Sequence, residues 1–539
     1  MARTPLLRSL VDLARDHHRA ARRGIPVDAI REERAALSRR RFLAGAGAAA
    51  AAIALPGAKL ARAAAQPKIA VVGGGIAGLT TALTLADAGV ASTVYEASGR
   101  IGGRMFSNPS YWDQGQVSEW CGELIDTGHK TIRALAKRFN LPLVDLLAAE
   151  PNSSQSTFRF GGQYYPESQA ITDFKPVHNA LVGDIQGASY PTTYQLSTPA
   201  GQVLDAMTVY EWIESRVPGG HASPMGKLLD LAYATEYGAD TTEQSALNLV
   251  YLLGYQASPG NFSIFGASDE RSHIIGGNQQ LPQAIADYLG VGPVVKTGMR
   301  MLALAKNADG TYALTFSTAG GTNVVTADIV VLTLPFAVLR NLNYVSAGFD
   351  ALKDTTIQQL GRGRNGKLQL QFDSRLWNQS GAWPGISSGD SYADTGYQGT
   401  WDVTRGQGGS NGILVDYTGG SPTLAMNANT GFSNASSNKV QMDAATFLSR
   451  IEPVFPGLTS HWNGKATSSL PHLDSNMLCS YSYWKPGQYT SIGGYEKVRQ
   501  GNVFFAGEHT SQDFQGFMEG GSSEGVRAAN EILTALGKK

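Results

Sequence analysis

The sequence predicts an α/β fold, α+β over the whole chain, with more than one domain. Two observations carry this prediction. An apolar segment at 68–72 runs into glycines and a helical pattern, and strand-like segments return near 327 and 502. The chain between them is helical at 126–269 and richer in strands at 346–485. With 539 residues, of which 42% are hydrophobic, the chain can bury a large core.

The glycine-rich segment after the first strand predicts a phosphate-binding loop. The run KIAVV is apolar enough for a buried parallel strand. Gly73, Gly75 and Gly78 then form a GxGxxG pattern at the start of a helix, which has Ile76 and Ala77 in its first turn. The first glycine permits a tight turn, the second lets the backbone approach a pyrophosphate, and the third lets helix and strand pack closely. The helix N-terminus then presents unpaired N–H groups to the phosphates.

A second strand at 91–96 ends at Glu96, about 20 residues beyond the first glycine, where an acid accepts hydrogen bonds from ribose hydroxyls. Strand, glycines, helix, strand and acid in this order predict a Rossmann-like dinucleotide-binding unit. A nicotinamide and a flavin dinucleotide both fit such a unit.

Composition excludes several other classes of function. Lys and Arg together number 44, as do Asp and Glu, so no basic excess indicates a nucleic-acid partner. The two cysteines, Cys121 and Cys479, exclude a disulfide framework and allow at most one bridge, with two free core thiols as the favoured state. The nine histidines show no metal-ligand spacing and no nucleophile has an organised base, so no metal site is expected.

The first 65 residues resemble an export signal and are set apart from the fold. A charged stretch at 1–37 precedes a short apolar run at 44–55, and small residues follow at 61–65. The apolar run is shorter than the roughly 20 residues that span a bilayer, so no stable membrane anchor is expected. We predict export to the periplasm or the extracellular space by the twin-arginine machinery, from Ser38, Arg39, Arg40, Phe42 and Leu43.

Two further motifs narrow the choice of dinucleotide. The segment EASGRIGGR places Arg100, Gly103 and Arg104 beside the predicted loop, and NVFFAGEHT precedes a glycine-rich helix start near Met518. Together with IIGGNQQLPQAIA from 274 and ADIVVLTLPFAVL from 327, these segments follow the order of the flavin-dependent amine oxidase family. The chain after residue 67 resembles that family, which includes monoamine oxidases, polyamine oxidases and L-amino-acid oxidases.

The resemblance implies how the chain is divided. A discontinuous Rossmann-like FAD-binding domain would comprise 66–125, 270–345 and 486–539. A mixed-sheet substrate-binding domain would comprise 346–485, with 126–269 as its helical part, and 1–65 would be the signal segment. The family pattern is also compatible with a homodimer.

The resemblance assigns FAD contacts as well. Val295 would contact the adenine half, Arg104 the phosphates, Glu508 the ribityl and phosphate region, and the backbone at Met518 the flavin pyrimidine edge. The remaining FAD contacts implied by the motifs are Gly73, Gly75, Ile76, Ala77, Gly78, Glu96, Arg100, Gly103, Gly122 and Glu123. Gln488 stands where covalent monoamine oxidases carry a tethering cysteine, so the FAD is expected to be noncovalent.

Three residues match catalytic positions of the family. Lys367 matches the lysine that holds a water near flavin N5, and burial would favour its neutral form. Tyr489 and Phe517 match the aromatic pair that encloses the substrate amine, although Phe517 replaces the usual tyrosine or tryptophan. The implied reaction is oxidation of a C–N bond, hydrolysis of the imine, and release of ammonia and hydrogen peroxide with O2 as acceptor.

The substrate is the least determined part of the prediction. The arginine that binds the substrate carboxylate in some relatives falls near Leu124 and is absent, and Arg405, with Trp401 as a wall, could replace it. L-amino acids are favoured, with 2-oxo acids as products, because exported bacterial proteins of this general pattern resemble broad L-amino-acid oxidases. Mono-, di- or polyamines remain an alternative, in which Glu123 could meet a second amine. A dehydrogenase with a quinone or haem acceptor and a flavin-binding module without turnover also remain open.

Overall fold

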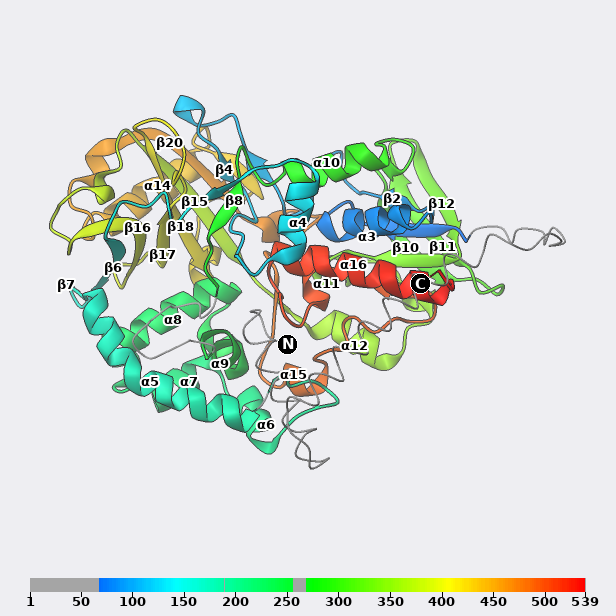
Figure 1. The fold of residues 1–539 in the computed structure, drawn as a ribbon, viewed down its shortest axis with the longest axis horizontal. Helices are drawn as coiled ribbons and strands as arrows, with labels where there is room; N and C mark the ends of the chain where they lie inside the picture. Colours follow the sequence, from blue (N-terminus) through cyan, green and yellow to red (C-terminus); the bar gives the residue numbers. More distant parts are fainter. Residues whose placement is uncertain (1–66, 189, 255–267, 539) are drawn as a thin grey trace, which may run out of the picture. The chain divides into compact units, whose positions relative to one another are not determined.

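The computed structural model describes residues 67–188, 190–254 and 268–538. The predicted export signal lies outside these residues. The described chain from Lys68 onward contains a parallel sheet, a large mixed sheet and a group of helices (Figure 1). The prediction of an α/β fold is therefore confirmed. Among the described residues, no helix combines the length and hydropathy needed to cross a membrane.

The parallel sheet joins strands from three separate parts of the chain. Its order is β22-β13-β1-β2-β9, and every neighbouring pair is parallel. The strands are β1 (Ile69–Val72), β2 (Thr93–Tyr95), β9 (Val295–Lys296), β13 (Ile329–Leu332) and β22 (Val503–Phe505). The sheet thus brings the glycine-rich loop after β1 beside the loops that follow β13 and β22.

Both faces of this sheet are covered, as the continuous apolar run at 69–72 predicts. Ile69 and Val71 belong to a core that includes Leu79 of α3 (Ile76–Asp87) and Ile532 of α16 (Met518–Ala535). Their neighbours Ala70 and Val72 face a second core with the antiparallel sheet β10 (Arg300–Lys306), β11 (Tyr312–Thr318) and β12 (Gly321–Ala327). Helices α4 (Lys130–Arg138) and α10 (Gln280–Leu289) pack beside α16 and α3.

The second large sheet is mixed, with the order β19-β20-β15-β18-β17-β16-β6-β7. Only the β16–β6 pair is parallel. Its strands are β6 (Ser154–Phe160), β7 (Gln163–Tyr164), β15 (Asn365–Phe372), β16 (Ile386–Ala393), β17 (Gly399–Asp402), β18 (Gly412–Gly419), β19 (Phe432–Asn434) and β20 (Trp462–Ser469). The region 126–269 was expected to be helical, but it supplies β6 and β7 to this sheet.

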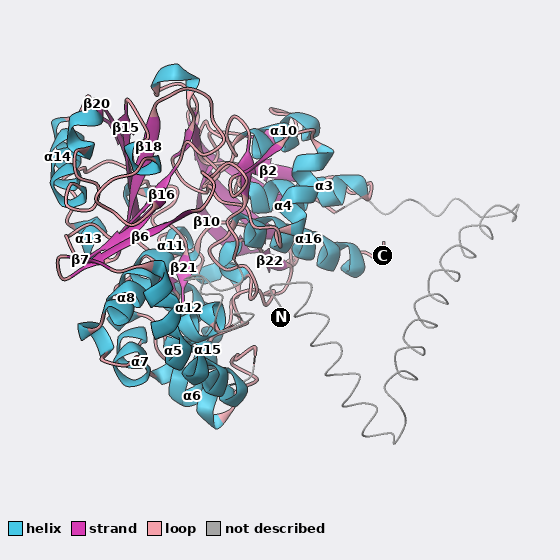
Figure 2. Cartoon of the chain, turned by 60° about the vertical axis from the view of Figure 1, so that its left-hand side comes forward, coloured by secondary structure: helices cyan, strands magenta, loops and turns pink. Residues whose placement is uncertain are grey.

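Alternation along β15 decides what faces the site. Leu368 and Leu370 enter a core with helix α14 (Asn438–Ile451), so Lys367 and Gln369 point to the opposite face. A group of helices lies beside this sheet (Figure 2), and contacts run from α8 to β16 and β18 and from α5 to β6. These helices are α5 (Glu167–Ala188), α6 (Pro199–Ala206), α7 (Val209–Arg216), α8 (Pro224–Tyr237) and α9 (Ala246–Leu253).

The remaining elements are short. The strand pairs are β3 (Ser107–Asn108) with β4 (Ser118–Glu119), β5 (Leu143–Asp145) with β8 (Ser272–Ile274), and β14 (Gly361–Arg362) with β21 (Ser482–Tyr483). The other α-helices are α11 (Phe336–Leu339), α12 (Ala351–Gln359), α13 (Ser421–Leu424) and α15 (Gln488–Ser491). The 3₁₀ turns are η2 (Asp113–Gly115), η3 (Gly220–Ala222), η4 (Thr241–Glu243), η5 (Val345–Ala347), η6 (Leu376–Asn378), η7 (Leu458–His461), η8 (Pro471–Leu473) and η9 (Glu508–Thr510).

Candidate functional site

A single cavity of about 510 Å³ brings together residues of the glycine-rich loop, the C-terminal motif and the large sheet. Most of the residues predicted from the sequence line it. They are Gly73, Gly75, Ile76, Ala77, Glu96, Gly103, Arg104, Gly122, Glu123, Lys367, Trp401, Glu508, Phe517 and Met518. The cavity therefore has a dinucleotide end, formed by the loop after β1, and a second end among the strands of the large sheet and helices α5 and α8.

The glycines of the loop have different reasons to be glycine. A Cβ at Gly78 would lie 2.1 Å from the Gly73 carbonyl oxygen, so this position is fixed by close packing and does not line the cavity. A Cβ at Gly75 would meet no protein atom closer than 4.0 Å. Since Gly75 lines the cavity, its missing side chain leaves room for a ligand against the backbone.

Two helix N-termini open into this cavity. Helix α3 follows Gly75 and helix α16 follows Phe517, and no side chain caps either of them. Gly75, Phe517 and Met518 all line the cavity. Uncapped N–H groups and the helix dipole favour an anion at each N-terminus. This pair of sites fits the pyrophosphate and the electron-rich edge of a flavin dinucleotide.

Glu96 and Glu508 are anchored by the protein as well as exposed to the cavity. The carboxylate of Glu96 accepts hydrogen bonds from the Gly74 and Ser98 N–H groups, both at 2.8 Å, and its oxygens can accept further bonds from a ribose. Glu508 accepts from the Gly516 N–H at 2.8 Å and pairs with Arg104 at 3.1 Å. Burial alone would raise the pKa of Glu508, but Arg104 holds it below its usual range.

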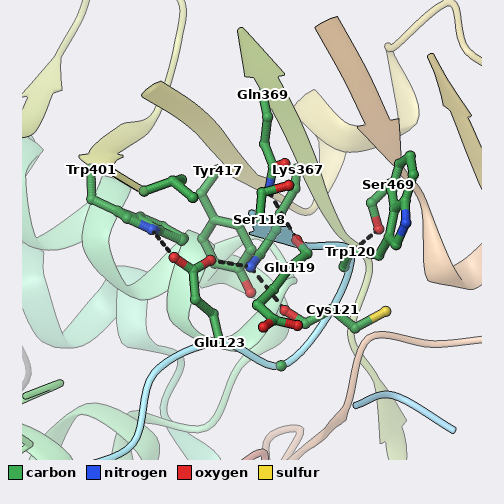
Figure 3. A network of polar contacts seen from close by, with 12 residues as sticks. Ser118, Glu119, Trp120, Cys121, Glu123, Lys367, Gln369, Trp401, Tyr417 and Ser469 are labelled. Atoms are coloured by element: carbon green, nitrogen blue, oxygen red, sulfur yellow. Dashed lines mark hydrogen bonds and ion pairs between the residues drawn. The ribbon is translucent and has the colours of Figure 1, made fainter. Parts of the chain in front are cut away.

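A buried polar network lies on the large-sheet side of the cavity (Figure 3). Lys367 of β15 points at Glu123, and its Nζ donates to Glu123 Oε2 at 2.7 Å and to the Cys121 carbonyl at 2.8 Å. Trp401 of β17 donates its indole N–H to Glu123 Oε1 at 2.9 Å. Burial would raise the pKa of Glu123, but the Lys367 ammonium lowers it. Lys367 thus faces the Glu123 carboxylate inside the cavity wall.

Tyr481 takes the place that the sequence prediction gave to Tyr489. Tyr481 lines the cavity and its hydroxyl lies 3.0 Å from that of Tyr417, whose ring contacts Trp401 at 5.1 Å between centroids. Tyr489 does not line the cavity, because it lies in α15 and donates to Asn248 Oδ1 at 3.0 Å. The prediction of Tyr489 is corrected. Tyr481 begins the aromatic segment YSYW, eight residues before Tyr489, and this segment was the signal in the sequence that could have indicated the cavity tyrosine.

Arg405 is unavailable to a substrate. Its Nη1 pairs with Glu150 at 2.7 Å and its Nε donates to the Asp402 carbonyl at 3.1 Å. The residue is 8% exposed and does not line the cavity, whereas the neighbouring Trp401 does. The predicted replacement of a carboxylate-binding arginine by Arg405 is therefore wrong. Glu123, the predicted alternative contact for a second amine, is already engaged by Lys367.

Two predicted FAD contacts, Arg100 and Val295, also lie away from the cavity, as does Gln488, the residue at the expected tethering position. Arg100 braces the loop by donating to the Gly103 carbonyl at 2.7 Å and stacks on the Phe106 ring. Val295 is buried in β9, where it pairs with Val94. Gln488 does not line the cavity, because its side chain donates to the Gln359 carbonyl at 2.7 Å. Of the two cysteines of the chain, Cys121 lines the cavity and Cys479 does not.

The second end of the cavity holds acidic residues that the sequence prediction missed. Each comes from a different part of the chain, so no local motif groups them. They are Glu167, Glu236, Glu270 and Asp390. Among the described residues, no group of three or more His, Cys, Asp or Glu side chains is arranged to hold a metal ion.

The glycine cradle, the two uncapped helix N-termini and the aromatic walls together fit a flavoprotein oxidoreductase. Comparison with known proteins agrees: the chain matches flavin containing amine oxidoreductases over residues 76–533 and belongs to that family.

Individual relatives are distant. Mouse flavin-containing amine oxidase B is 24% identical over 488 residues, covering 87% of this chain and 86% of its own. The L-amino-acid oxidase of Sistrurus catenatus edwardsii is 23% identical over 496 residues, covering 87% of each chain. The structure of cyclohexylamine oxidase from Brevibacterium oxydans superposes with a TM-score of 0.73 at 20% identity, covering 88% of this chain and 100% of that one. These relatives differ in substrate.

Proposed function

We propose that this protein is an oxidase of amines that carry no carboxylate at the reacting carbon, with noncovalently bound FAD. The proposal rests on the observation that the positively charged side chains lining the cavity are already paired with acids. Among the described residues that line the cavity, the cations are Arg104, which pairs with Glu508, and Lys367, which pairs with Glu123. An α-carboxylate would therefore find no unpaired cation among these described residues, and burying it unpaired is costly. This disfavours L-amino acids as substrates.

The residues that would hold FAD follow from the cavity. Gly75 and the N-terminus of α3 would contact the pyrophosphate, Glu96 the ribose, and the N-terminus of α16 the flavin edge. FAD held there would supply an acceptor for the two electrons removed from the C–N bond, with O2 as the final oxidant and hydrogen peroxide as its product.

The protein's own residues position the amine and exclude water. Tyr417, Tyr481 and Phe517 line the cavity with flat apolar surfaces that suit an uncharged amine. The Lys367–Glu123 pair fixes a polar point on the cavity wall, and Trp401 holds the Glu123 carboxylate in place. This pair can hold a water molecule for hydrolysis of the imine to the carbonyl product and ammonia.

The low reactivity of the Cys121 thiol supports noncovalent binding of FAD. Burial raises the pKa of Cys121 to about 11, which disfavours the reactive thiolate, and in Figure 3 its sulfur points away from Lys367. Acid precipitation of the purified protein should release the flavin into the supernatant. Flavin that stays in the pellet would contradict this, and Cys121→Ser would then identify the attachment site.

The test of function is anaerobic bleaching of the bound flavin by a panel of primary amines and their parent L-amino acids. We expect bleaching by amines and, on admission of air, hydrogen peroxide in equal amount to the amine oxidised. Faster bleaching by amino acids would overturn the proposal in favour of an L-amino-acid oxidase. Bleaching without peroxide would indicate a dehydrogenase with another acceptor.

Export by the twin-arginine machinery remains part of the proposal. The motif Ser38, Arg39, Arg40, Phe42 and Leu43 supports it. Replacing Arg39 and Arg40 with lysine should retain the enzyme in the cytoplasm with its flavin bound. Unchanged export would show that another signal acts.

A further inference from the structure

The segment 119–123, which runs from the end of β4 to Glu123, is held at each of its backbone carbonyls by a side chain from elsewhere in the chain. Three of the donors lie on the large sheet: Gln369 to the Glu119 carbonyl at 2.9 Å, Ser469 to the Trp120 carbonyl at 2.5 Å and Lys367 to the Cys121 carbonyl at 2.8 Å (Figure 3). The carbonyls of Gly122 and Glu123 both accept from the side-chain amide of Asn278, at 3.0 and 2.7 Å.

Asn278 comes from the other side of the cavity. It directly precedes Gln279 and helix α10, which packs against α3 beside the parallel sheet. The segment 119–123 is therefore fastened to the large sheet at one end and to the dinucleotide side at the other. Its last residue, Glu123, carries the carboxylate that accepts from Lys367.

The polar atoms of Asn278 that bear on this segment are fully used. Asn278 is completely buried, and its backbone N–H donates to Glu119 Oε1 at 2.7 Å. Its Oδ1 accepts from the Ile274 N–H at 2.9 Å, which leaves the Nδ2 hydrogens for the two carbonyls. Only one orientation of the amide satisfies all of these partners, so the side chain is fixed.

The same amide lies at the N-terminus of α16. Asn278 Nδ2 is 3.8 Å from Met518 Sδ, and a Cβ at Gly122 would lie 3.0 Å from the Met518 side chain. Gly122, Glu123 and Met518 line the cavity, whereas Asn278 does not. Asn278 thus cannot touch a ligand in the cavity, but it holds the groups that can.

We propose that Asn278 is a positioning residue for amine oxidation, which sets the Glu123–Lys367 pair against the N-terminus of α16. The inference rests on the proposed oxidase function and names a residue that acts through this pair. Among the described residues, no other donor reaches the Gly122 or Glu123 carbonyl. Without the amide, two buried acceptors lose their partners and the segment must shift to recover them.

The first test is Asn278→Asp, which keeps an oxygen for the Ile274 N–H and removes the amide donors. In the holoenzyme, kcat for a primary amine should fall roughly tenfold or more while KM changes by less than about twofold, because the pair moves but the aromatic walls stay. Asn248→Asp is the matched control. Asn248 is also buried, donates its amide to the Trp484 carbonyl at 2.9 Å and does not line the cavity, so its loss should lower stability but not kcat.

A double variant tests whether Asn278 acts through the pair. In the Lys367→Met background, Asn278→Asp should lower kcat by less than about threefold, because the pair is already absent. An undiminished effect in that background would overturn the inference, as would a loss of kcat in Asn248→Asp as large as in Asn278→Asp.

The visible absorption band of the bound flavin gives a readout that does not depend on turnover. It should shift in Asn278→Asp and not in Asn248→Asp, because Gly122 and Met518 border the flavin edge. Asn278→Ala removes the same donors without adding a carboxyl group and decides the test if Asn278→Asp does not fold. If wild type oxidises no amine, the proposed function fails while a shifted band still supports the positioning role. Unchanged kcat and an unchanged band would overturn that role and leave the oxidase intact.

Discussion

The two ends of the cavity present opposite charges by different means. At the dinucleotide end, uncapped helix N-termini after Gly75 and Phe517 offer backbone N–H groups to anions. At the acidic end, where Glu167, Glu236, Glu270 and Asp390 line the cavity, side chains place carboxylates on the wall. The first end is made of backbone held by close packing, whereas the second is made of side chains that can change one at a time.

This difference teaches where the family can vary. Backbone donors depend on the path of the chain, so they tolerate few substitutions at the glycines but many elsewhere. The acidic end depends on the identity of separate side chains on α5, α8 and β16. These side chains can therefore change without disturbing the dinucleotide end, and the relatives are named for different substrates.

The largest effect is expected at the dinucleotide end. Gly78→Val should abolish flavin binding or folding, because even a Cβ there would lie 2.1 Å from the Gly73 carbonyl. The ratio of flavin to protein absorbance and the circular dichroism spectrum measure this. Gly99→Ala, in the following loop, is the control, since its Cβ would meet nothing within 4 Å. Normal flavin content in Gly78→Val would show that the backbone there is not fixed as described.

The second largest effect is expected from a substitution at the centre of the cavity. Lys367→Met leaves the Glu123 carboxylate buried without its partner, which typically costs about 3–5 kcal/mol of stability. Urea unfolding of the holoenzyme should show this loss, and the double variant with Glu123→Gln should recover most of it. Amine turnover should fall in both variants, because the polar point on the wall is lost. A double variant no more stable than Lys367→Met would argue against a coupled pair.

A pair of tyrosines sharpens the boundary of the site. Tyr481→Ala should lower kcat/KM for amines roughly tenfold, since it removes a cavity wall. Tyr489→Phe should leave kcat/KM unchanged and cost about 1 kcal/mol of stability, because it removes the hydrogen bond to Asn248 and keeps the ring. The reverse pattern would restore the assignment predicted from the sequence.

The smallest effect concerns charge repulsion at the acidic end. The pKa of Glu270 is raised by burial and by Asp126, Glu236 and Asp390, with Arg405 opposing. The raised folded pKa means that wild type loses stability as pH rises above the ordinary carboxyl pKa of about 4.3. Glu270→Gln removes this loss, so its advantage in free energy of unfolding should grow from near zero at pH 4 to about 1 kcal/mol or more at pH 8. A constant difference across this range would contradict the repulsion.

The residues that form the dinucleotide end of the cavity could be predicted from the sequence alone. The order of strand, glycines and helix at 69–87 and the motif at 502–518 predicted the cavity contacts of Gly75, Glu96, Glu508 and Met518. The reason is that a tight turn, a close approach and a helix start each depend on neighbouring residues. Lys367 could likewise be placed from its motif, because alternation along β15 turns it away from the core.

The residues that line the substrate end of the cavity could be identified only from the tertiary structure. Tyr481 and Tyr489 lie in the same short segment, and packing of α15 turned one away from the cavity. Arg405 was removed from the site by Glu150, which is far from it in the chain. The acidic end depends on side chains that are separated by tens to hundreds of residues and brought together by the mixed sheet and helices α5 and α8. Contacts of this kind have no local signature, because they depend on which strands pair and in which register.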